Sequence, residues 1–280
     1  MKKVICIMGP TASGKTKLSI AIAKHFGGEV INGDSVAIYK ELNIGSAKIT
    51  HDEMQGIKHH LLSVANLDEG FSVFDFQKET RACIEQIKYP IIVGGSGLYI
   101  KSALYDYRFE QMDPKDLPSL DHMISYIKEN DPLLELDWKN ERRVVSAYKN
   151  IVSGVKPSEN QFKNQPLYDI YLIYLNLDKE SLKKRLEIRL DQMLSDGFIE
   201  ETRNLIDYPL NIIGYRELKG FLNNEVSLEE AKTKIIQVTM KFAKRQKTWF
   251  LNQMQTHMYD ALSSTLIEDV ITDLTHFLEG

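Results

Sequence analysis

The sequence has few of the residues that build zinc sites, disulfide frameworks or membrane spans. Only two of its 280 residues are cysteines, and Cys6 and Cys83 lie far apart without C-x-x-C spacing, which argues against a zinc site or a disulfide framework. No apolar run approaches the roughly 20 residues that span a bilayer, and the N-terminal run of about five is shorter than the core of a signal peptide. We therefore expect no membrane association and a location in the reducing cytoplasm.

Positive charge is not in excess either. The formal net charge is −4, which argues against a protein that coats nucleic acid non-specifically, because phosphate contacts need clustered Lys and Arg. Positive residues do cluster at 141–149, 183–189 and 241–247. Each cluster taken alone is more typical of a solvated helix face, so a local basic surface stays open.

The strongest motif that is present is "GPTASGKT", which spells G-x-x-x-x-G-K-[ST]. It follows an apolar run and precedes a helix-like stretch that ends at Phe26, as a phosphate-binding loop does. In such a loop backbone N–H groups surround an anion, the lysine neutralises its oxygens and the hydroxyl residue can bind Mg²⁺. The motif does not say which phosphate compound binds. The loop comprises Gly9, Pro10, Thr11, Ala12, Ser13, Gly14, Lys15 and Thr16.

Short apolar runs alternate with helical patterns along the chain. The runs at 3–8, 29–32, 90–93 and 170–175 are typical of strands buried on both faces of a parallel sheet. Helix starts are indicated by capping residues that include Ser72, Asp178 and Ser227. These patterns predict an α/β protein with a P-loop NTPase-like three-layer α/β/α core, a parallel sheet and right-handed crossovers.

The pattern changes between about residues 107 and 165. This stretch consists of helical pieces punctuated by Pro and Asp and contains no convincing buried strand. We predict that residues 107–165 form an inserted small helical subdomain, and that residues 1–106 and 166–280 form the core.

Two further loops follow predicted strands. Asp34 comes after the second strand, and Ser96 lies in the glycine-rich "GGSGLY" after the third. The carboxyl ends of parallel strands share one edge of the sheet, where ligands bind. Asp34 is suited either to act as a general base or to cap a turn, and Ser96 offers one hydroxyl among glycines. The motifs suggest that both residues lie beside the P-loop.

The motifs leave several functions open. The guanine-reading N-K-x-D string and a separate Walker-B aspartate are not evident, so a switch GTPase is disfavoured. A P-loop kinase of a small acceptor, with ATP in the loop, and a transferase that uses the loop for another phosphate both stay possible.

Five strings in order resemble the bacterial tRNA dimethylallyltransferases, also called tRNA isopentenyltransferases. They are "GPTASGKT" (9–16), "GDSVAIYKELNIGSAK" (33–48), "GGSGLY" (94–99), "IIGYRE" (212–217) and "FAKRQKTWF" (242–250). The resemblance implies an enzyme that moves the dimethylallyl group of dimethylallyl diphosphate to the exocyclic amine of the adenosine 3′ to the anticodon, in tRNAs that read codons starting with U. It thus implies dimethylallyl diphosphate, Mg²⁺ and a tRNA anticodon stem-loop as partners, and we expect a monomer.

The resemblance also implies roles for single residues. Lys15 and a Mg²⁺ ion on Thr16 would take up charge as the allylic C–O bond breaks. Asp34 matches the family's general base, and Ser96 stands where the family usually has threonine. Arg216 matches an arginine that contacts the diphosphate.

The tRNA side rests on the same resemblance. The residues implied to bind tRNA are Asp34, Ser35, Val36, Ala37, Arg142, Arg143, Lys244, Arg245 and Gln246. Three positions depart from the family pattern: Ala37 stands where glutamine is frequent, and Ser146 and Met240 stand where arginine is frequent. These departures put tRNA affinity or the choice of tRNA in doubt. Two rivals remain beside a kinase: an isopentenyltransferase acting on free AMP, ADP or ATP, and a non-catalytic tRNA-binding P-loop protein.

Overall fold

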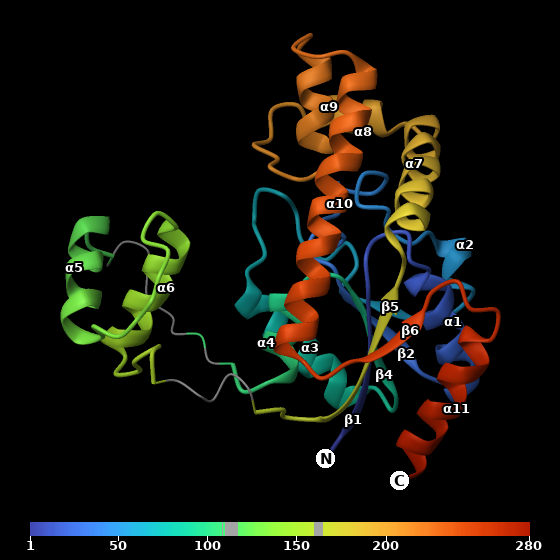
Figure 1. Ribbon diagram of the computed structural model, residues 1–280, viewed down its shortest axis with the longest axis horizontal. Helices are drawn as coiled ribbons and strands as arrows, with labels where there is room; N and C mark the ends of the chain where they lie inside the picture. The colour runs from blue at the N-terminus through green and yellow to red at the C-terminus, as the bar shows by residue number, and fades with distance from the viewer. Residues whose placement is uncertain (108, 110–116, 160–164) are drawn as a thin grey trace. The chain divides into compact units, whose positions relative to one another are not determined.

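The computed structural model describes residues 1–107, 109, 117–159 and 165–280, and the chain divides into two compact units. The larger unit comprises Met1–Leu104 and Tyr168–Gly280, and the smaller unit comprises Tyr105–Leu167. These boundaries lie two residues from those expected for the core and the insertion. Figure 1 shows both units, coloured along the chain. The rest of the predicted insertion, residues 108, 110–116 and 160–164, lies outside the described residues.

The larger unit is built on a six-stranded parallel sheet with the order β3-β2-β4-β1-β5-β6. The four predicted strands are confirmed. The two edge strands were not predicted, because β3 has two residues, β6 has four, and neither has a fully buried residue to produce an apolar signal. The strands are β1 (Lys3–Met8), β2 (Glu29–Gly33), β3 (His59–His60), β4 (Pro90–Gly94), β5 (Asp169–Asn176) and β6 (His257–Asp260).

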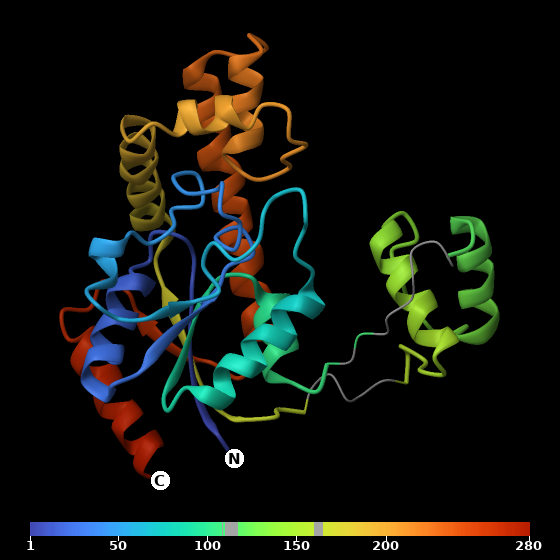
Figure 2. The ribbon, with the colours of Figure 1, turned by 180° about the vertical axis from the view of Figure 1, so that it is seen from behind.

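Helices cover both faces of this sheet, which confirms the three-layer prediction. On one face α1 (Lys15–Phe26) and α11 (Leu266–Glu279) bury apolar side chains against β1, β2, β4 and β5. On the other face lie α3 (Val73–Gln86), α4 (Gly97–Leu104) and the end of α10 (Leu228–Gln253), as Figures 1 and 2 show. The rings of Tyr174 on β5 and Phe250 on α10 lie 6.0 Å apart.

The predicted helix starts are confirmed by their capping bonds. The side chains of Ser72 and Ser227 accept hydrogen bonds from the third residue of α3 and α10, and both form capping boxes. Asp178 accepts two backbone N–H groups at the start of α7 (Lys179–Ser195). These side chains satisfy N–H groups that have no partner inside the helix.

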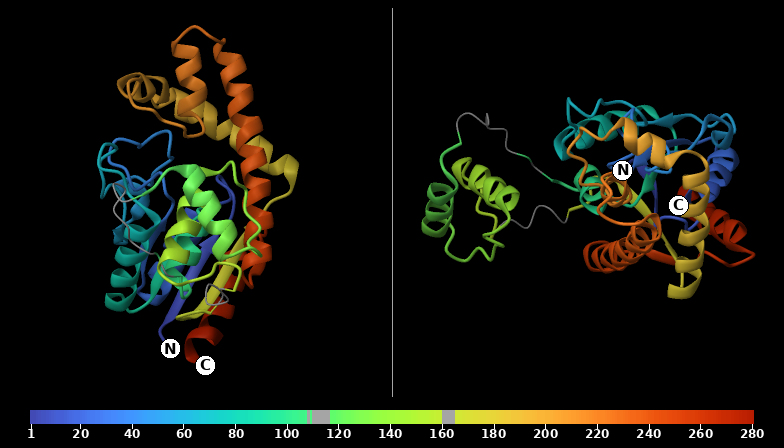
Figure 3. Two further views of the ribbon diagram at one scale, coloured as in Figure 1. Left: turned by 90° about the vertical axis from the view of Figure 1, so that its left-hand side faces the viewer. Right: turned by 90° about the horizontal axis from the view of Figure 1, so that it is seen from above.

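A second apolar cluster lies beyond the carboxyl edge of the sheet. We call it the helical cap: α7, α8 (Phe198–Asn204), α9 (Tyr215–Leu222) and the first half of α10. Figure 3 shows α10 running from this cap down along the sheet. The loop after β2, which continues to the short helix α2 (His51–Met54), places Leu42 in the same cluster. The residues that follow Asp34 are therefore held by the cap.

The smaller unit has a core of its own. Its helices α5 (Leu120–Asn130) and α6 (Glu141–Val152) pack through five buried residues: Met123, Ile127, Val144, Ala147 and Ile151. The chain enters and leaves this unit side by side, because Asp106 N donates to Gln165 O at 2.9 Å. Across the described parts of both units, none of the helices is apolar over a length that would cross a bilayer.

Candidate functional site

A cavity of about 1260 Å³ opens at the carboxyl edge of the sheet in the larger unit. It is lined by the P-loop, by the loops after β2 and β4, and by one face each of α7 and α10. The three loops singled out in the sequence therefore do meet at one place. Among the residues that line the cavity are Lys15, Thr16, Asp34, Gly95 and Gln246.

The P-loop has the strained backbone that an anion cradle needs. Gly9 has φ +149°, and a Cβ atom there would lie 2.8 Å from the carbonyl oxygen of Leu175. Gly14 has φ +91°, and Ala12, which is not a glycine, has φ +62°. Glycine adopts such values without strain, whereas the value at Ala12 costs free energy, and such residues concentrate at functional sites. Ser13 Oγ is buried and makes no hydrogen bond within the described chain, so the cradle has polar capacity that the protein does not use.

Lys15 lies across this loop. Its ammonium group donates to the carbonyl oxygens of Gly9 at 2.8 Å and Pro10 at 2.7 Å. Burial and the nearby guanidinium of Arg189 lower the pKa of Lys15 to about 8, while the Asp34 carboxylate opposes part of that shift. An anion in the cradle would raise this pKa again, because a nearby negative charge stabilises the protonated lysine.

Asp34 caps the turn that follows β2, one of the two roles left open by the sequence. Its Oδ1 accepts the backbone N–H of Val36 at 2.8 Å. Its Oδ2 makes no hydrogen bond to any residue in the described ranges, so this oxygen can still accept a proton. Capping and general-base chemistry are thus compatible in one carboxylate.

Ser96 joins the β4 loop to the β2 loop. Its Oγ accepts the backbone N–H of Ser35 at 3.0 Å and donates to the Ser35 hydroxyl at 3.1 Å. This places Ser96 beside Asp34, as the motifs suggest. The backbone N–H and the hydroxyl of Ser35 both contact the Ser96 hydroxyl.

Each glycine of "GGSG" meets a different neighbour. A Cβ atom at Gly94 would lie 2.1 Å from the carbonyl oxygen of Gly33, and one at Gly97 would lie 2.3 Å from the Trp249 ring. Gln246 donates to Gly95 O at 2.7 Å. The turn is therefore pressed between the sheet and α10. Trp249 packs on this turn.

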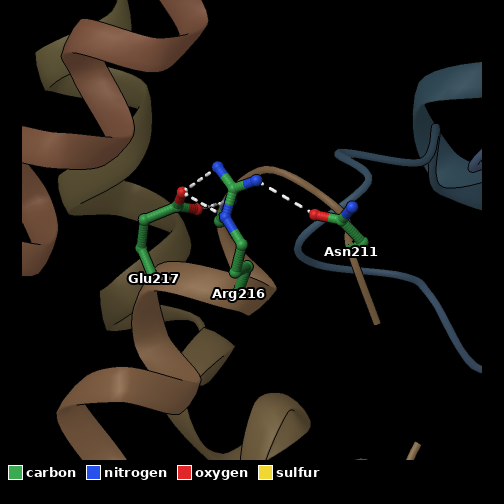
Figure 4. A network of polar contacts seen from close by, with 4 residues as sticks. Asn211, Arg216 and Glu217 are labelled. Atoms are coloured by element: carbon green, nitrogen blue, oxygen red, sulfur yellow. Dashed lines mark hydrogen bonds and ion pairs between the residues drawn. The ribbon is translucent and has the colours of Figure 1, made fainter. Parts of the chain in front are cut away.

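The structure does not bring Arg216 to the cavity. Figure 4 shows its guanidinium on α9, donating to Glu217 Oε1 at 3.0 and 2.5 Å and to Asn211 Oδ1 at 3.0 Å. Arg216 is absent from the residues that line the cavity in the described chain. Glu217 is only 8% exposed and also accepts the N–H of Gly214. Arg216 is therefore held by a buried carboxylate outside the cavity lining of the described chain, and its contact with the diphosphate stays a prediction.

Two other arginines stand at the rim of the P-loop. Arg185 Nη1 donates to Ala12 O at 3.2 Å, and Arg189 Nη2 donates to Ala47 O at 3.4 Å. Both line the cavity. The interpretation of 183–189 as a solvated helix face holds for the exposed Lys183 and Lys184 but not for these two. Their spacing of four residues, which aligns them on one helix face, is the signal that identifies them.

The residues expected to bind tRNA lie in different surroundings. Lys244 and Arg245 are exposed on α10, and Arg142 and Arg143 are exposed on α6 of the smaller unit. Gln246 lines the cavity. Val36 and Ala37 are less accessible to a bound tRNA. Val36 packs against the helical cap, and Ala37 is 5% exposed at the cavity wall.

The parallel sheet, the P-loop at its carboxyl edge and the joined loops at Asp34 and Ser96 define a P-loop protein with an NTPase-like fold. Within this class, the family model described as IPP transferase matches residues 37–253. The chain is 59% identical over 278 residues to a tRNA dimethylallyltransferase of Acholeplasma laidlawii, covering 99% of both chains. It is 40% identical over 301 residues to one of Anoxybacillus flavithermus, covering 100% of this chain and 97% of that one. The chain therefore belongs to the IPP transferase family, and the resemblance seen in its motifs is confirmed.

Solved structures agree with this assignment. A tRNA isopentenylpyrophosphate transferase from Staphylococcus epidermidis is 33% identical with a TM-score of 0.75, covering 99% of this chain and 100% of that one. A eukaryotic dimethylallyltransferase acting on tRNA is 28% identical with a TM-score of 0.87, covering 100% of this chain and 80% of that one.

Proposed function

We propose that this protein is a tRNA dimethylallyltransferase. It transfers the dimethylallyl group of dimethylallyl diphosphate to the exocyclic amine of the adenosine 3′ to the anticodon, in tRNAs reading codons that start with U, and releases diphosphate. The observation that supports this most directly is one cavity that holds an anion cradle and a carboxylate oxygen free of hydrogen bonds to the described chain, in a chain of this family. Ser96 is bonded to the loop of Asp34 beside this cavity but is not among its lining residues in the described chain.

The P-loop binds the prenyl donor. Its backbone N–H groups and Lys15 hold the diphosphate, and Arg185 and Arg189 supply further positive charge at the rim. As the allylic C–O bond breaks, negative charge grows on the leaving diphosphate, and fixed cations stabilise that charge more than they stabilise the intact donor.

Mg²⁺ fits the donor side as a partner of the diphosphate. The Thr16 hydroxyl lines the cavity and makes no hydrogen bond to the described residues. In the described chain no three carboxylate, His or Cys side chains gather to form a cage. Mg²⁺ commonly uses one or two protein oxygens and completes its shell with phosphate oxygens and water. Thr16 would hold the ion, which would neutralise charge on the diphosphate.

Asp34 acts on the acceptor, the adenine amine. The adenine amine nitrogen forms a bond to C1 of the dimethylallyl group as the C–O bond to diphosphate breaks, and the amine then loses a proton. Asp34 Oδ2, which makes no hydrogen bond to the described residues, would take that proton. Ser96 keeps the Asp34 turn in position through Ser35, and its own contact with the donor stays a prediction.

The tRNA must present an extruded base to this cavity. Exposed cations on α10 (Lys244 and Arg245) and on α6 (Arg142 and Arg143) are our candidates for phosphate contacts with the anticodon stem-loop. We also propose that the protein acts as a monomer, because one chain supplies the cradle, Asp34 and Ser96. Its two cysteines are unpaired, which suits the cytoplasm.

The test is incubation of the protein with labelled dimethylallyl diphosphate, Mg²⁺ and bulk tRNA that lacks the modification. Label should move into the tRNA, and mass spectrometry should locate it on the adenosine next to the anticodon. Hydrolysis of ATP without transfer to RNA, or transfer to free AMP but not to tRNA, would contradict the proposal.

A further inference from the structure

Glu201 on α8 holds the loop that forms one wall of the cavity. Its Oε2 accepts the backbone N–H groups of Asn43 at 3.0 Å and Ile44 at 2.8 Å. Its Oε1 accepts the N–H of Gly45 at 2.8 Å and the hydroxyl of Tyr215 at 2.5 Å. Three consecutive N–H groups converging on one carboxylate fix a loop far more firmly than one such bond, because ionic acceptors strengthen each of them.

The loop held in this way has a strained conformation. Ala47 has φ +50°, a left-handed value that side chains other than glycine rarely adopt. Two backbone bonds close the turn around it, Ala47 N to Ile44 O at 2.8 Å and Lys48 N to Asn43 O at 3.0 Å. Strain of this kind persists only when the surrounding contacts impose it.

The loop is also pressed against the helical cap. A Cβ atom at Gly45 would lie 2.2 Å from a ring carbon of Phe198 and 2.4 Å from one of Tyr215. On the far side Lys48 Nζ donates to Tyr39 O at 2.6 Å and to Ser63 Oγ at 2.8 Å. The loop is thus held from two directions and cannot slide along the cap.

The other end of this loop reaches the cavity. The carbonyl oxygen of Ala47 accepts from Arg189 Nη2 at 3.4 Å. Arg189 lines the cavity, and its charge is close enough to Lys15 to lower the pKa of that lysine. A continuous chain of contacts therefore runs from Glu201 through the loop to a cation beside the P-loop.

We propose that Glu201 is a positioning residue for the donor: its carboxylate fixes residues 43–47 so that the Ala47 carbonyl holds Arg189 at the rim of the P-loop, where the guanidinium meets the diphosphate. Glu201 does not line the cavity in the described chain and touches no reacting atom. The proposal rests on the proposed function in one respect, that a diphosphate occupies the P-loop.

The chemistry requires a carboxylate at this position. In Glu201→Gln one oxygen is replaced by an NH₂ group, which donates and cannot accept. At least one of the three backbone N–H groups then faces another donor instead of an acceptor. The loop loses that hydrogen bond and is held less firmly. Arg189 consequently loses a fixed acceptor, and its side chain explores other rotamers.

The experiment measures binding of inorganic pyrophosphate with Mg²⁺ to the full-length protein by isothermal titration calorimetry. Glu201→Gln should raise the Kd for pyrophosphate by about tenfold, within the range of measured couplings between contacting groups. The matched control is Glu200→Gln on the same helix, where the side chain is exposed and pairs with Arg203. It should change the Kd by less than about twofold.

A double-mutant cycle separates positioning from general loosening. Arg189→Gln should itself raise the Kd, and adding Glu201→Gln to it should have no further effect, because Glu201 acts through Arg189. Multiplying effects, or an unchanged Kd in Glu201→Gln, would overturn the proposal. If Glu201→Gln does not fold, Glu201→Asp takes its place in the cycle, since it keeps the charge but shortens the reach.

The outcomes also distinguish this inference from the proposed function. A wild-type protein that binds pyrophosphate and shows the cycle without modifying tRNA would support Glu201 as a positioning residue and contradict the tRNA activity. A wild-type protein that does not bind pyrophosphate would overturn the positioning role, because no anion would then meet Arg189.

Discussion

At the scale of single residues, the cavity combines a cation and a carboxylate that are close enough to influence each other. Lys15 has a pKa lowered to about 8 by burial and by Arg189, and Asp34 partly restores its charge. The carboxylate itself uses one oxygen on the turn and leaves the other for chemistry. We therefore propose that donor binding and proton removal belong to different side chains, which variants can separate.

Asp34→Asn separates the two steps best. Asparagine keeps the Oδ1 atom that accepts the N–H of Val36, so the turn is preserved, but it cannot take a proton. We expect kcat to fall by about 10²–10⁴, as for loss of a general base, while the Kd for pyrophosphate changes by less than about twofold. Rapid-quench transfer assays and calorimetry measure the two quantities. Weakened pyrophosphate binding would show that Asp34 helps to hold the donor instead.

We expect Lys15 to make donor binding depend on pH. Because the pKa of Lys15 is lowered to about 8, the ligand-free lysine loses its charge as the pH rises through 8, and the bound anion favours the charged form. The Kd for pyrophosphate should therefore rise between pH 7 and pH 9. Lys15→Arg stays charged over this range and serves as the control, with a smaller dependence on pH. An equal dependence in both proteins would assign the effect to another group.

At the scale of elements, the site depends on how closely loops approach helices. The loop at 43–45 lies against α8 and α9 with no space for a side chain at Gly45. The helical cap also contains the string "GYRE". Its side chains form hydrogen bonds within the cap: Tyr215 donates to Glu201, and Arg216 donates to Glu217. In this arrangement the string supports the loop, and Arg216 lies outside the cavity lining of the described chain.

Gly45→Ala tests that approach. The new methyl group would lie 2.2 Å from Phe198, and overpacking of this kind costs about 1–3 kcal/mol of unfolding free energy. The control is Gly220→Ala in α9, where the nearest atom to a new Cβ is 3.4 Å away. It should stabilise the protein by about 0.5–1 kcal/mol, because alanine is the better helix former. Urea unfolding measures both, and equal effects of the two variants would contradict the tight contact.

At the scale of the whole molecule, two units with separate cores share one chain. The smaller unit packs around Met123 and Val144 with other apolar residues of α5 and α6, and its ends are joined by the bond between Asp106 and Gln165. Because these two ends are adjacent, a short linker can connect them if the smaller unit is removed. The P-loop, Asp34, Ser96 and Arg189 all belong to the larger unit.

Replacing residues 107–165 with a short Gly-Ser linker should therefore leave the larger unit folded. The Kd for pyrophosphate should stay within about twofold of that of the full chain. Affinity for tRNA should fall at least about tenfold, because Arg142 and Arg143 are lost and each phosphate contact contributes to binding. Circular dichroism, calorimetry and filter binding measure the three quantities. Loss of pyrophosphate binding would show that the smaller unit completes the cradle.

Local patterns made much of this fold predictable. Ser72, Asp178 and Ser227 cap helices where the sequence places them, because a capping bond involves residues only two or three apart. The four inner strands follow from their continuous apolar runs. The edge strands β3 and β6 do not, because short, partly exposed strands depend on a neighbouring strand for their existence.

The phosphate loop, the alternation of strands and helices, and the position of Asp34 and Ser96 at one edge of the sheet are all predictable from the residues alone. These follow from short-range geometry and from the rule that parallel strands share their carboxyl edge. Which arginines lie beside the loop depends on how the helices pack. Arg189 reaches it because α7 packs beside the P-loop, whereas Arg216 is turned away by the buried Glu217. Both are arginines on helices, and only the packing of those helices distinguishes them.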